Sequence, residues 1–158
     1  MKERHDLKRW ILYTNRHLAA KNKDIFLCGI SMGCATTLMA AGLDLPDNVK
    51  GIIADCGFTS PWDIIKHVAK ERFYLPPFPL MYMVDLISEV VAGFGLKEVS
   101  IPEIMKRNKI PVLFIHGDAD DYVPMWMTIK NYEACAAKKE LYICLLYTSP
   151  SPRDRSVS

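Results

Sequence analysis

Residues 24–43 read DIFLCGISMGCATTLMAAGL, and this stretch decides the fold. The short apolar run at residues 25–28 is typical of a buried parallel strand. Residues 35–41 place apolar side chains at helical spacing among strong helix formers, and Gly42 is well placed to end that helix. The sequence therefore predicts a strand, a tight turn and a helix in immediate succession.

The pentapeptide GISMG, residues 29–33, stands at this predicted turn. A GxSxG pattern between a strand and a helix is typical of a nucleophile elbow, in which a strained Ser points out above the sheet. We expect Gly29 and Gly33 to remove Cβ atoms that would strike the neighbouring strand and helix. The following helix begins with free N–H groups, so the amide of Met32 can donate to a developing oxyanion. This context favours Ser31 as a catalytic nucleophile over a chance match in a Gly-Ser loop.

The composition excludes several classes of protein. The 158 residues amount to about one domain, and half of them are apolar, which is enough for a buried core. A net charge of +2 is close to neutral and does not indicate a nucleic-acid-binding surface. The five Cys and four His residues show neither a CxxC pair nor metal-ligand spacing, so we expect no metal or other cofactor. Five cysteines cannot all form disulfide pairs, which suggests a reducing compartment. The sequence also shows no signal peptide and no membrane-spanning run, so we expect a cytoplasmic location. The sequence leaves the oligomeric state open.

The rest of the chain predicts alternating helices and strands. We expect helices at residues 2–20, 101–108 and 128–138, buried strands at 49–54 and 110–115, and the start of a fourth strand at 140–143. In open parallel sheets the carboxyl ends of the strands face the active-site crevice. We therefore expect Ser31 and the acid-rich turn after residue 115 to lie at the same edge of the sheet.

Residues 59–100 differ from this alternation and predict an inserted helical cap. The segment begins with Ser60-Pro61 and holds two apolar stretches around the Pro-rich segment LPPFPL. Its large apolar residues include Phe73, Tyr74, Phe78, Met81, Tyr82 and Met83. We interpret them as ordinary packing of the cap on the core, with an acyl-binding wall or a membrane-touching surface as alternatives.

Three segments carry a resemblance to a known fold. GISMG follows one predicted strand, GIIADCGF contains the next, and HGDADDYVP, residues 116–124, follows a third. Together they resemble the α/β-hydrolase superfamily, particularly bacterial serine hydrolases of the serine-aminopeptidase-like and deacetylase-like groups with a helical cap. The resemblance covers residues 1–143 and implies a partial α/β-hydrolase fold, with a mostly parallel sheet flanked by helices and a cap over about residues 59–100.

The resemblance also implies roles for particular residues. The superfamily pattern HGxxDxxVP places its acid on Asp120, and Ser31 becomes the nucleophile of a triad whose acid orients the base. Asp118 and Asp121 compete for the acid's role, and Asp55 is a weaker alternative. The implied activity is hydrolysis of an ester, amide or thioester of a small-molecule acyl substrate. A non-catalytic binding protein of the same fold and a lipid-surface protein are the alternatives.

The base of the triad has no candidate in this sequence. The superfamily places its His after the acid, whereas His5, His17, His67 and His116 all precede Asp120. We expect His116 to organise the strand-end turn. We also expect the chain to be a fragment, inactive by itself, whose His and second oxyanion donor belong to parts of the protein outside it.

The last fifteen residues break from the composition of the segment before them. Residues 144–154 read CLLYTSPSPRD, and their back-translation matches the adapter used in transposon-based DNA library preparation. We therefore expect residues 144–158 to be a translated sequencing adapter, or otherwise a disordered Ser/Pro-rich tail, without a function.

Overall fold

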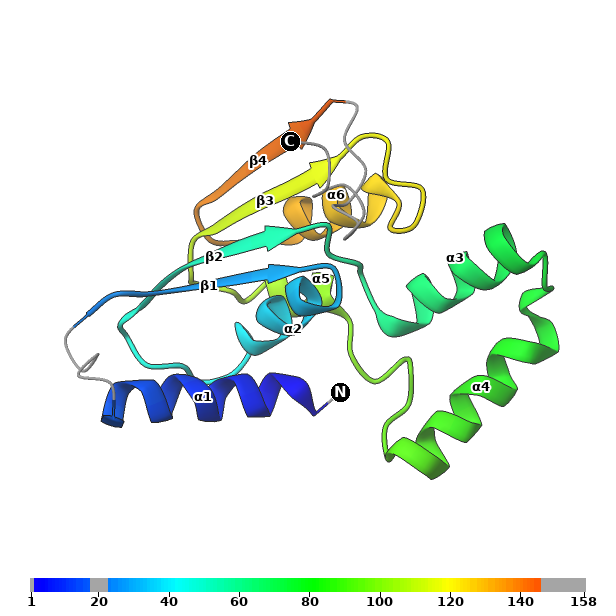
Figure 1. Ribbon diagram of the computed structural model, residues 1–158, viewed down its shortest axis with the longest axis horizontal. Coiled ribbons are helices and arrows are strands. Elements are labelled where there is room, and N and C mark those ends of the chain that lie inside the picture. Colours follow the sequence, from blue (N-terminus) through cyan, green and yellow to red (C-terminus); the bar gives the residue numbers. More distant parts are fainter. Residues whose placement is uncertain (1, 18–22, 146–158) are drawn as a thin grey trace, which may run out of the picture.

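The computed structural model describes residues 2–17 and 23–145 (Figure 1). In chain order its helices and strands are α1 (Glu3–His17), β1 (Ile25–Ile30), α2 (Met32–Ala40), β2 (Val49–Asp55), α3 (Pro61–Phe73), α4 (Pro77–Ala92), α5 (Ile101–Met105), β3 (Val112–Gly117), α6 (Met125–Ala134) and β4 (Lys139–Cys144). Helices and strands alternate except between β2 and β3, where α3, α4 and α5 follow one another. The end of the first predicted helix, residues 18–20, and most of the expected tail, residues 146–158, lie outside the described residues.

The four strands form one sheet in the order β1-β2-β3-β4, and every neighbouring pair is parallel. The carboxyl ends are in step, because Ile30 pairs with Asp55 and Asp55 pairs with Ile115. The residues that follow these strands therefore emerge side by side at one edge of the sheet. This confirms the predicted mostly parallel α/β fold.

The hydrophobic core lies between the sheet and the helices α2, α5 and α6. Each of these elements contributes a fully buried apolar side chain: Leu38, Ile52, Met105, Phe114 and Met127. In contrast, α3 and α4 lie beyond the carboxyl ends of the strands (Figure 1). They occupy the range that the sequence predicts for the cap.

Helix α6 begins and ends three to four residues earlier than the sequence predicts. Pro124 stands before it in an extended conformation with φ at −60°, and a proline is compatible with a helix start because its missing N–H is not needed there. The helix ends at Ala134 because Cys135 is extended, with ψ at 120°. This shift places Thr128 and Asn131 in the middle of the helix.

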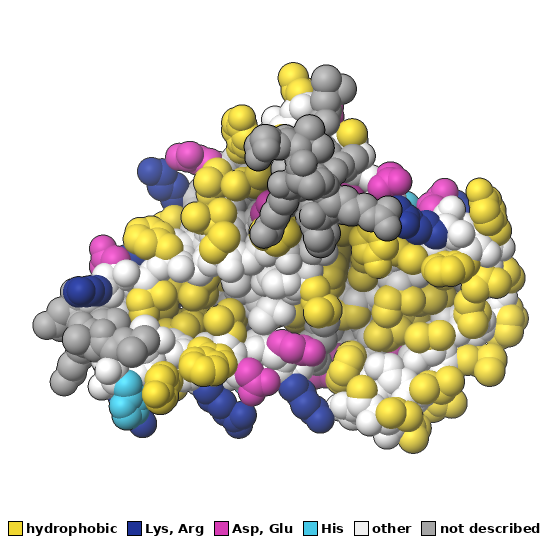
Figure 2. Space-filling model, in the orientation of Figure 1, with side chains coloured by type: hydrophobic (Ala, Val, Ile, Leu, Met, Phe, Trp, Pro, Cys, Tyr) yellow, Lys and Arg dark blue, Asp and Glu magenta, His cyan; other side chains and the backbone are white. Residues whose placement is uncertain are grey.

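The large apolar residues of the cap are mostly exposed, so their interpretation as ordinary packing is wrong except at Met81, which is 1% exposed. The other five have exposed fractions from 56% to 88%: Phe73, Tyr74, Phe78, Tyr82 and Met83. Among the described elements, α4 contacts only α3. Figure 2 shows hydrophobic side chains gathered over this part of the surface.

Candidate active site

Ser31 occupies the turn between β1 and α2 in a strained conformation. Its φ of 52° is a value that residues other than glycine rarely adopt, and its ψ is −113°. The Ser31 N–H donates to the carbonyl oxygen of Asp55 at 2.9 Å, which holds the turn against the end of β2. The side chain makes no capping hydrogen bond to α2. The backbone geometry of a nucleophile elbow is therefore present.

The two glycines of the elbow have different roles. A Cβ added to Gly29 would collide with the carbonyl group of Gly33 and would lie 2.6 Å from the backbone nitrogen of Cys34. This agrees with the expectation from the sequence. At Gly33 the expectation is wrong, because an added Cβ would meet no described atom within 4 Å. The close approach is made by the backbone of residue 33, so only residue 29 has to lack a side chain.

Met32 is the first residue of α2, with a side chain that is 62% exposed. The first N–H groups of a helix have no acceptor within the helix. The positive end of α2 and the Met32 N–H therefore lie next to Ser31, where they favour a negative charge.

A second residue with positive φ follows β2 directly. Cys56 has a φ of 44°, and its N–H donates to the carbonyl oxygen of Ile115 at 2.9 Å. Ile30, Asp55 and Ile115 are paired across β1, β2 and β3. The residues that follow them directly are Ser31, Cys56 and His116. Because neighbouring strands lie about 4.8 Å apart, Ser31 and the end of β3 are roughly 10 Å from each other.

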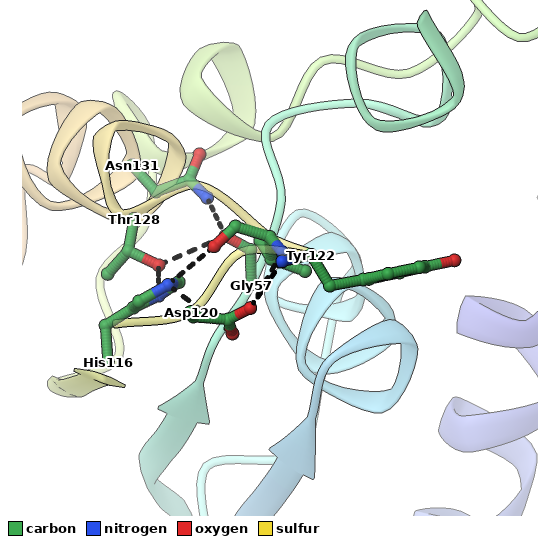
Figure 3. Close-up of polar contacts among 7 residues, drawn as sticks. Gly57, His116, Asp120, Tyr122, Thr128 and Asn131 are labelled. Atoms are coloured by element: carbon green, nitrogen blue, oxygen red, sulfur yellow. Dashed lines mark hydrogen bonds and ion pairs between the residues drawn. The ribbon is translucent and has the colours of Figure 1, made fainter. Parts of the chain in front are cut away.

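The acid turn holds Asp120 in a buried position (Figure 3). Its Oδ1 accepts hydrogen bonds from the N–H groups of Tyr122 at 2.9 Å and Val123 at 3.0 Å. Its Oδ2 has no hydrogen-bond partner among the described residues and lies 3.7 Å from Nε2 of His116, although the side chain is only 2% exposed. Leaving a buried carboxylate oxygen unsatisfied is costly. The geometry therefore leaves room for one more donor at Asp120.

The other two carboxylates of the turn lie in different surroundings. Asp118 is exposed, and the side chain of Asp121 is 79% exposed and lies 3.5 Å from the Arg72 guanidinium. An exposed pair of this kind is weak and screened by solvent. Only Asp120 combines a fixed carboxylate with an open, buried oxygen, so the geometry favours it over both competitors.

His116 organises the acid turn, as the sequence predicts. The ring is fully buried, with Nε2 at 2.8 Å from the carbonyl oxygen of Val123 and Nδ1 at 2.7 Å from Oγ1 of Thr128. Both ring nitrogens are therefore engaged in the structure of the turn. The remaining histidines lie on helices, His5 and His17 on α1 and His67 on α3.

Two polar residues of α6 complete this network, and sequence reasoning missed them. The Thr128 hydroxyl donates to the carbonyl oxygen of Gly57 at 3.2 Å, and the Asn131 side chain donates to that of Phe58 at 3.1 Å (Figure 3). Both side chains are buried. They tie the segment after β2 to α6 and to the acid turn. The available signal was their spacing of three residues, which places two polar side chains on one face of the helix.

Burial shifts the pKa of the Asp55 carboxyl and of the Cys34 thiol upward, towards the neutral form. Burial raises the pKa of Asp55; His116 and a hydrogen bond from Cys56 lower it, and the charge of Asp120 raises it. Burial raises the pKa of Cys34 well above its ordinary value, so this thiol is a poor nucleophile. Within residues 2–17 and 23–145 no three His, Cys, Asp or Glu side chains are grouped as metal ligands.

Comparison with protein families gives a match over residues 2–151 to the family described as the prolyl oligopeptidase family. A curated relative, the uncharacterized protein YqkD of Bacillus subtilis (strain 168), is 35% identical over 115 residues. That alignment covers 73% of this chain and 38% of YqkD.

Solved structures with a similar fold include esterases and a peptidase. Acetyl xylan esterase 1 from Thermoanaerobacterium sp. JW/SL YS485 superposes with a TM-score of 0.64 at 16% identity, covering 94% of this chain and 47% of the esterase. The Pyrococcus furiosus esterase Pf2001 gives 0.64 at 20% identity, with 94% and 54% covered. The acylaminoacyl peptidase of Pyrococcus horikoshii gives 0.58 at 20% identity, with 93% and 23% covered. These likenesses show the α/β-hydrolase fold, and the chain spans about half or less of the length of each of these proteins.

Proposed function

The chain belongs to the prolyl oligopeptidase family, and from this premise we propose that it supplies the nucleophile and the acid of a serine hydrolase cleaving an ester, amide or thioester bond. The family and the similar structures are hydrolases, both esterases and peptidases. The observation that carries the proposal is the open, buried Oδ2 of Asp120, which lies at the same edge of the sheet as the strained Ser31.

In the proposed mechanism the Ser31 hydroxyl attacks the carbonyl carbon of the substrate. A His from a part of the full-length protein outside this sequence takes the hydroxyl proton and returns it to the leaving group. Oδ2 of Asp120 accepts the Nδ1–H of that imidazole and stabilises the imidazolium. Water then hydrolyses the acyl-enzyme by the same steps. The separation of roughly 10 Å between the ends of β1 and β3 leaves space for a ring between nucleophile and acid.

The Met32 N–H is the proposed donor to the oxyanion of the tetrahedral intermediate. It stands at the positive end of α2, beside Ser31. The second donor is proposed to come from outside this sequence. One oxyanion donor contributes on the order of 10²–10³ to kcat in related chemistry. The reaction by this route uses no cofactor, and we propose that the protein acts in the cytoplasm.

A serine-directed phosphonate probe tests the nucleophile. In the full-length protein we expect Ser31→Ala to abolish covalent labelling, because among the described residues only the Ser31 hydroxyl lies in a strand–turn–helix elbow. Ser100→Ala is the matched control, since Ser100 is exposed and makes no capping hydrogen bond. Labelling that persists in Ser31→Ala would remove Ser31 from the mechanism. A full-length wild type that resists labelling altogether would favour a non-catalytic binding protein of the same fold.

The exposed apolar cap favours a second candidate function, docking on a lipid surface. Phe78 is 74% exposed and Ile87 is 56% exposed, and both belong to α4. In the part of the chain that the structure describes, no helix is long and apolar enough to cross a bilayer. Docking would therefore be peripheral. It predicts that the full-length protein co-sediments with phospholipid vesicles, and that the double variant Phe78→Ser, Ile87→Ser no longer does so while it still hydrolyses a soluble ester. If the full-length protein does not bind vesicles, this candidate function is wrong.

A further inference from the structure

An apolar groove lies between α3 and the acid turn. Its volume is about 270 Å³, and it is lined by Ile64, Ile65, Val68, Ala69, Phe73 and Tyr122. No charged side chain lines it. The groove is slightly smaller than the range of roughly 300–1,000 Å³ that is typical of whole ligand sites. It therefore fits one part of a substrate.

Tyr122 connects the groove to the acid of the proposed triad. Its N–H donates to Oδ1 of Asp120, while its ring points away from the polar cluster and forms one wall of the groove (Figure 3). The Arg72 guanidinium lies 5.3 Å from the centre of the Tyr122 ring and 3.5 Å from Oδ2 of Asp121. The end of α3 is thus joined to the acid turn, and one wall of the groove belongs to the residue whose N–H holds Asp120.

The other end of α3 is connected to β2, the strand that pairs with β1. The helix starts shortly after β2, at Ser60, whose hydroxyl accepts the Asp63 N–H at 3.0 Å. The Thr59 hydroxyl donates to Oδ2 of Asp63 at 2.6 Å. Ser31 is hydrogen-bonded to the last residue of the same strand. The groove therefore runs along a helix that starts shortly after β2 and whose last turn contacts the acid turn.

The lining and its charged neighbours define what the groove can hold. Ile64 and Ala69 are buried, and Ile65 and Val68 pack against the core cluster, so the floor is formed before any ligand binds. None of the lining side chains is charged, and the adjacent Arg72 and Asp121 carry opposite charges, so the groove offers no partner for an ionised group. An aliphatic chain gains about fourfold in affinity for each methylene group removed from water.

We propose that this groove holds an uncharged aliphatic chain of the substrate, which makes medium-chain esters or thioesters the substrate class. This inference rests on the proposed function for its catalytic meaning, but binding of the chain does not require Ser31. The groove can therefore be tested separately from the reaction.

The first test measures binding of octan-1-ol to the Ser31→Ala full-length protein by saturation-transfer NMR. We expect Val68→Trp, which fills the groove, to weaken binding at least tenfold. Val91→Trp adds the same side chain at an 81% exposed position of α4 and should change binding by less than twofold. Phe73→Ser, at a 65% exposed position that lines the groove, is the second variant in case Val68→Trp does not fold. Unchanged binding in the folded groove variants would overturn the proposal.

The second test measures kcat/KM of the full-length protein for 4-nitrophenyl esters with acyl chains of two to ten carbons. We expect kcat/KM to rise about fourfold per methylene until the groove is filled, and the ratio of the eight-carbon to the two-carbon ester to fall at least tenfold in Val68→Trp. Octyl acetate against ethyl octanoate tells whether the chain belongs to the alcohol or the acyl part. A flat profile in both series, with hydrolysis intact, would refute the groove and leave the hydrolase. Octanol binding that depends on Val68 without hydrolysis of any ester, thioester or amide would refute the hydrolase and leave the groove.

Discussion

Two neighbouring regions of the molecule use polar and apolar side chains in opposite ways. The strand-end rim, residues 29–33, 55–58 and 116–124, buries a carboxylate and an imidazole and holds them by backbone hydrogen bonds. The cap, residues 61–92, exposes many of its large apolar side chains. The rim is thus constrained by contacts within the described chain. The large apolar side chains of the cap have few such contacts and remain exposed, so they can contact a substrate or a lipid surface.

The largest effect is expected at Gly29. Gly29→Ala places a Cβ against backbone atoms of residues 33 and 34, which cannot rotate away, so we expect the free energy of unfolding to fall by about 3 kcal/mol or more. Urea unfolding followed by far-UV circular dichroism measures this. Gly33→Ala is the matched control; it should be neutral or stabilise by up to about 1 kcal/mol, because it adds helix propensity in open space. Equal losses in both variants would contradict the one-sided close approach.

Sequence reasoning located the elbow because every part of that signal is local: a strand, a tight GxSxG turn and a helix within twenty residues. It placed Asp120 through a family pattern of nine residues. It missed Thr128 and Asn131, since their partners at Gly57 and Phe58 lie more than seventy positions earlier in the chain.

The start of α6 and the exposure of the cap were also missed. The helix start depends on the backbone conformation at Pro124, which composition did not reveal. The exposure of the cap depends on which elements contact α4. The apolar composition indicates only that these side chains tend to be buried, not which element buries them.

A smaller effect is expected at Asp120. Asp120→Ala leaves the N–H groups of Tyr122 and Val123 without their acceptor, and we expect a loss of about 1–3 kcal/mol in the free energy of unfolding. Asp121→Ala, in the same turn, should cost less than about 0.5 kcal/mol because its pair with Arg72 is exposed. Urea unfolding separates the two. Similar losses would show that the buried carboxylate does not hold the turn.

A pH-dependent effect is expected from Asp55. Its pKa is raised by burial above the ordinary value of 3.8, so the folded state binds a proton more readily than the unfolded state. The ionised group therefore destabilises the protein above its folded pKa, and this cost disappears as the pH falls towards 3.8. Asp55→Asn should be more stable than wild type at neutral pH, and the difference should shrink as the pH is lowered. A difference in the free energy of unfolding that stays constant from pH 4 to 8 would contradict this.

The smallest effect is expected on the outer side of α4, at Val90 and Val91. They are 76% and 81% exposed, so replacing either by Ser removes little contact, and we expect changes within about 0.5 kcal/mol in the free energy of unfolding. Met81→Ala on the same helix is the control and should cost clearly more, because Met81 is buried. A loss above about 1 kcal/mol at either Val in the full-length protein would mean that this face is covered there. Only a covered valine lowers the free energy of unfolding by that much when a hydroxyl replaces its methyl groups. The exposure of the cap would then reflect a neighbour that lies outside the described residues.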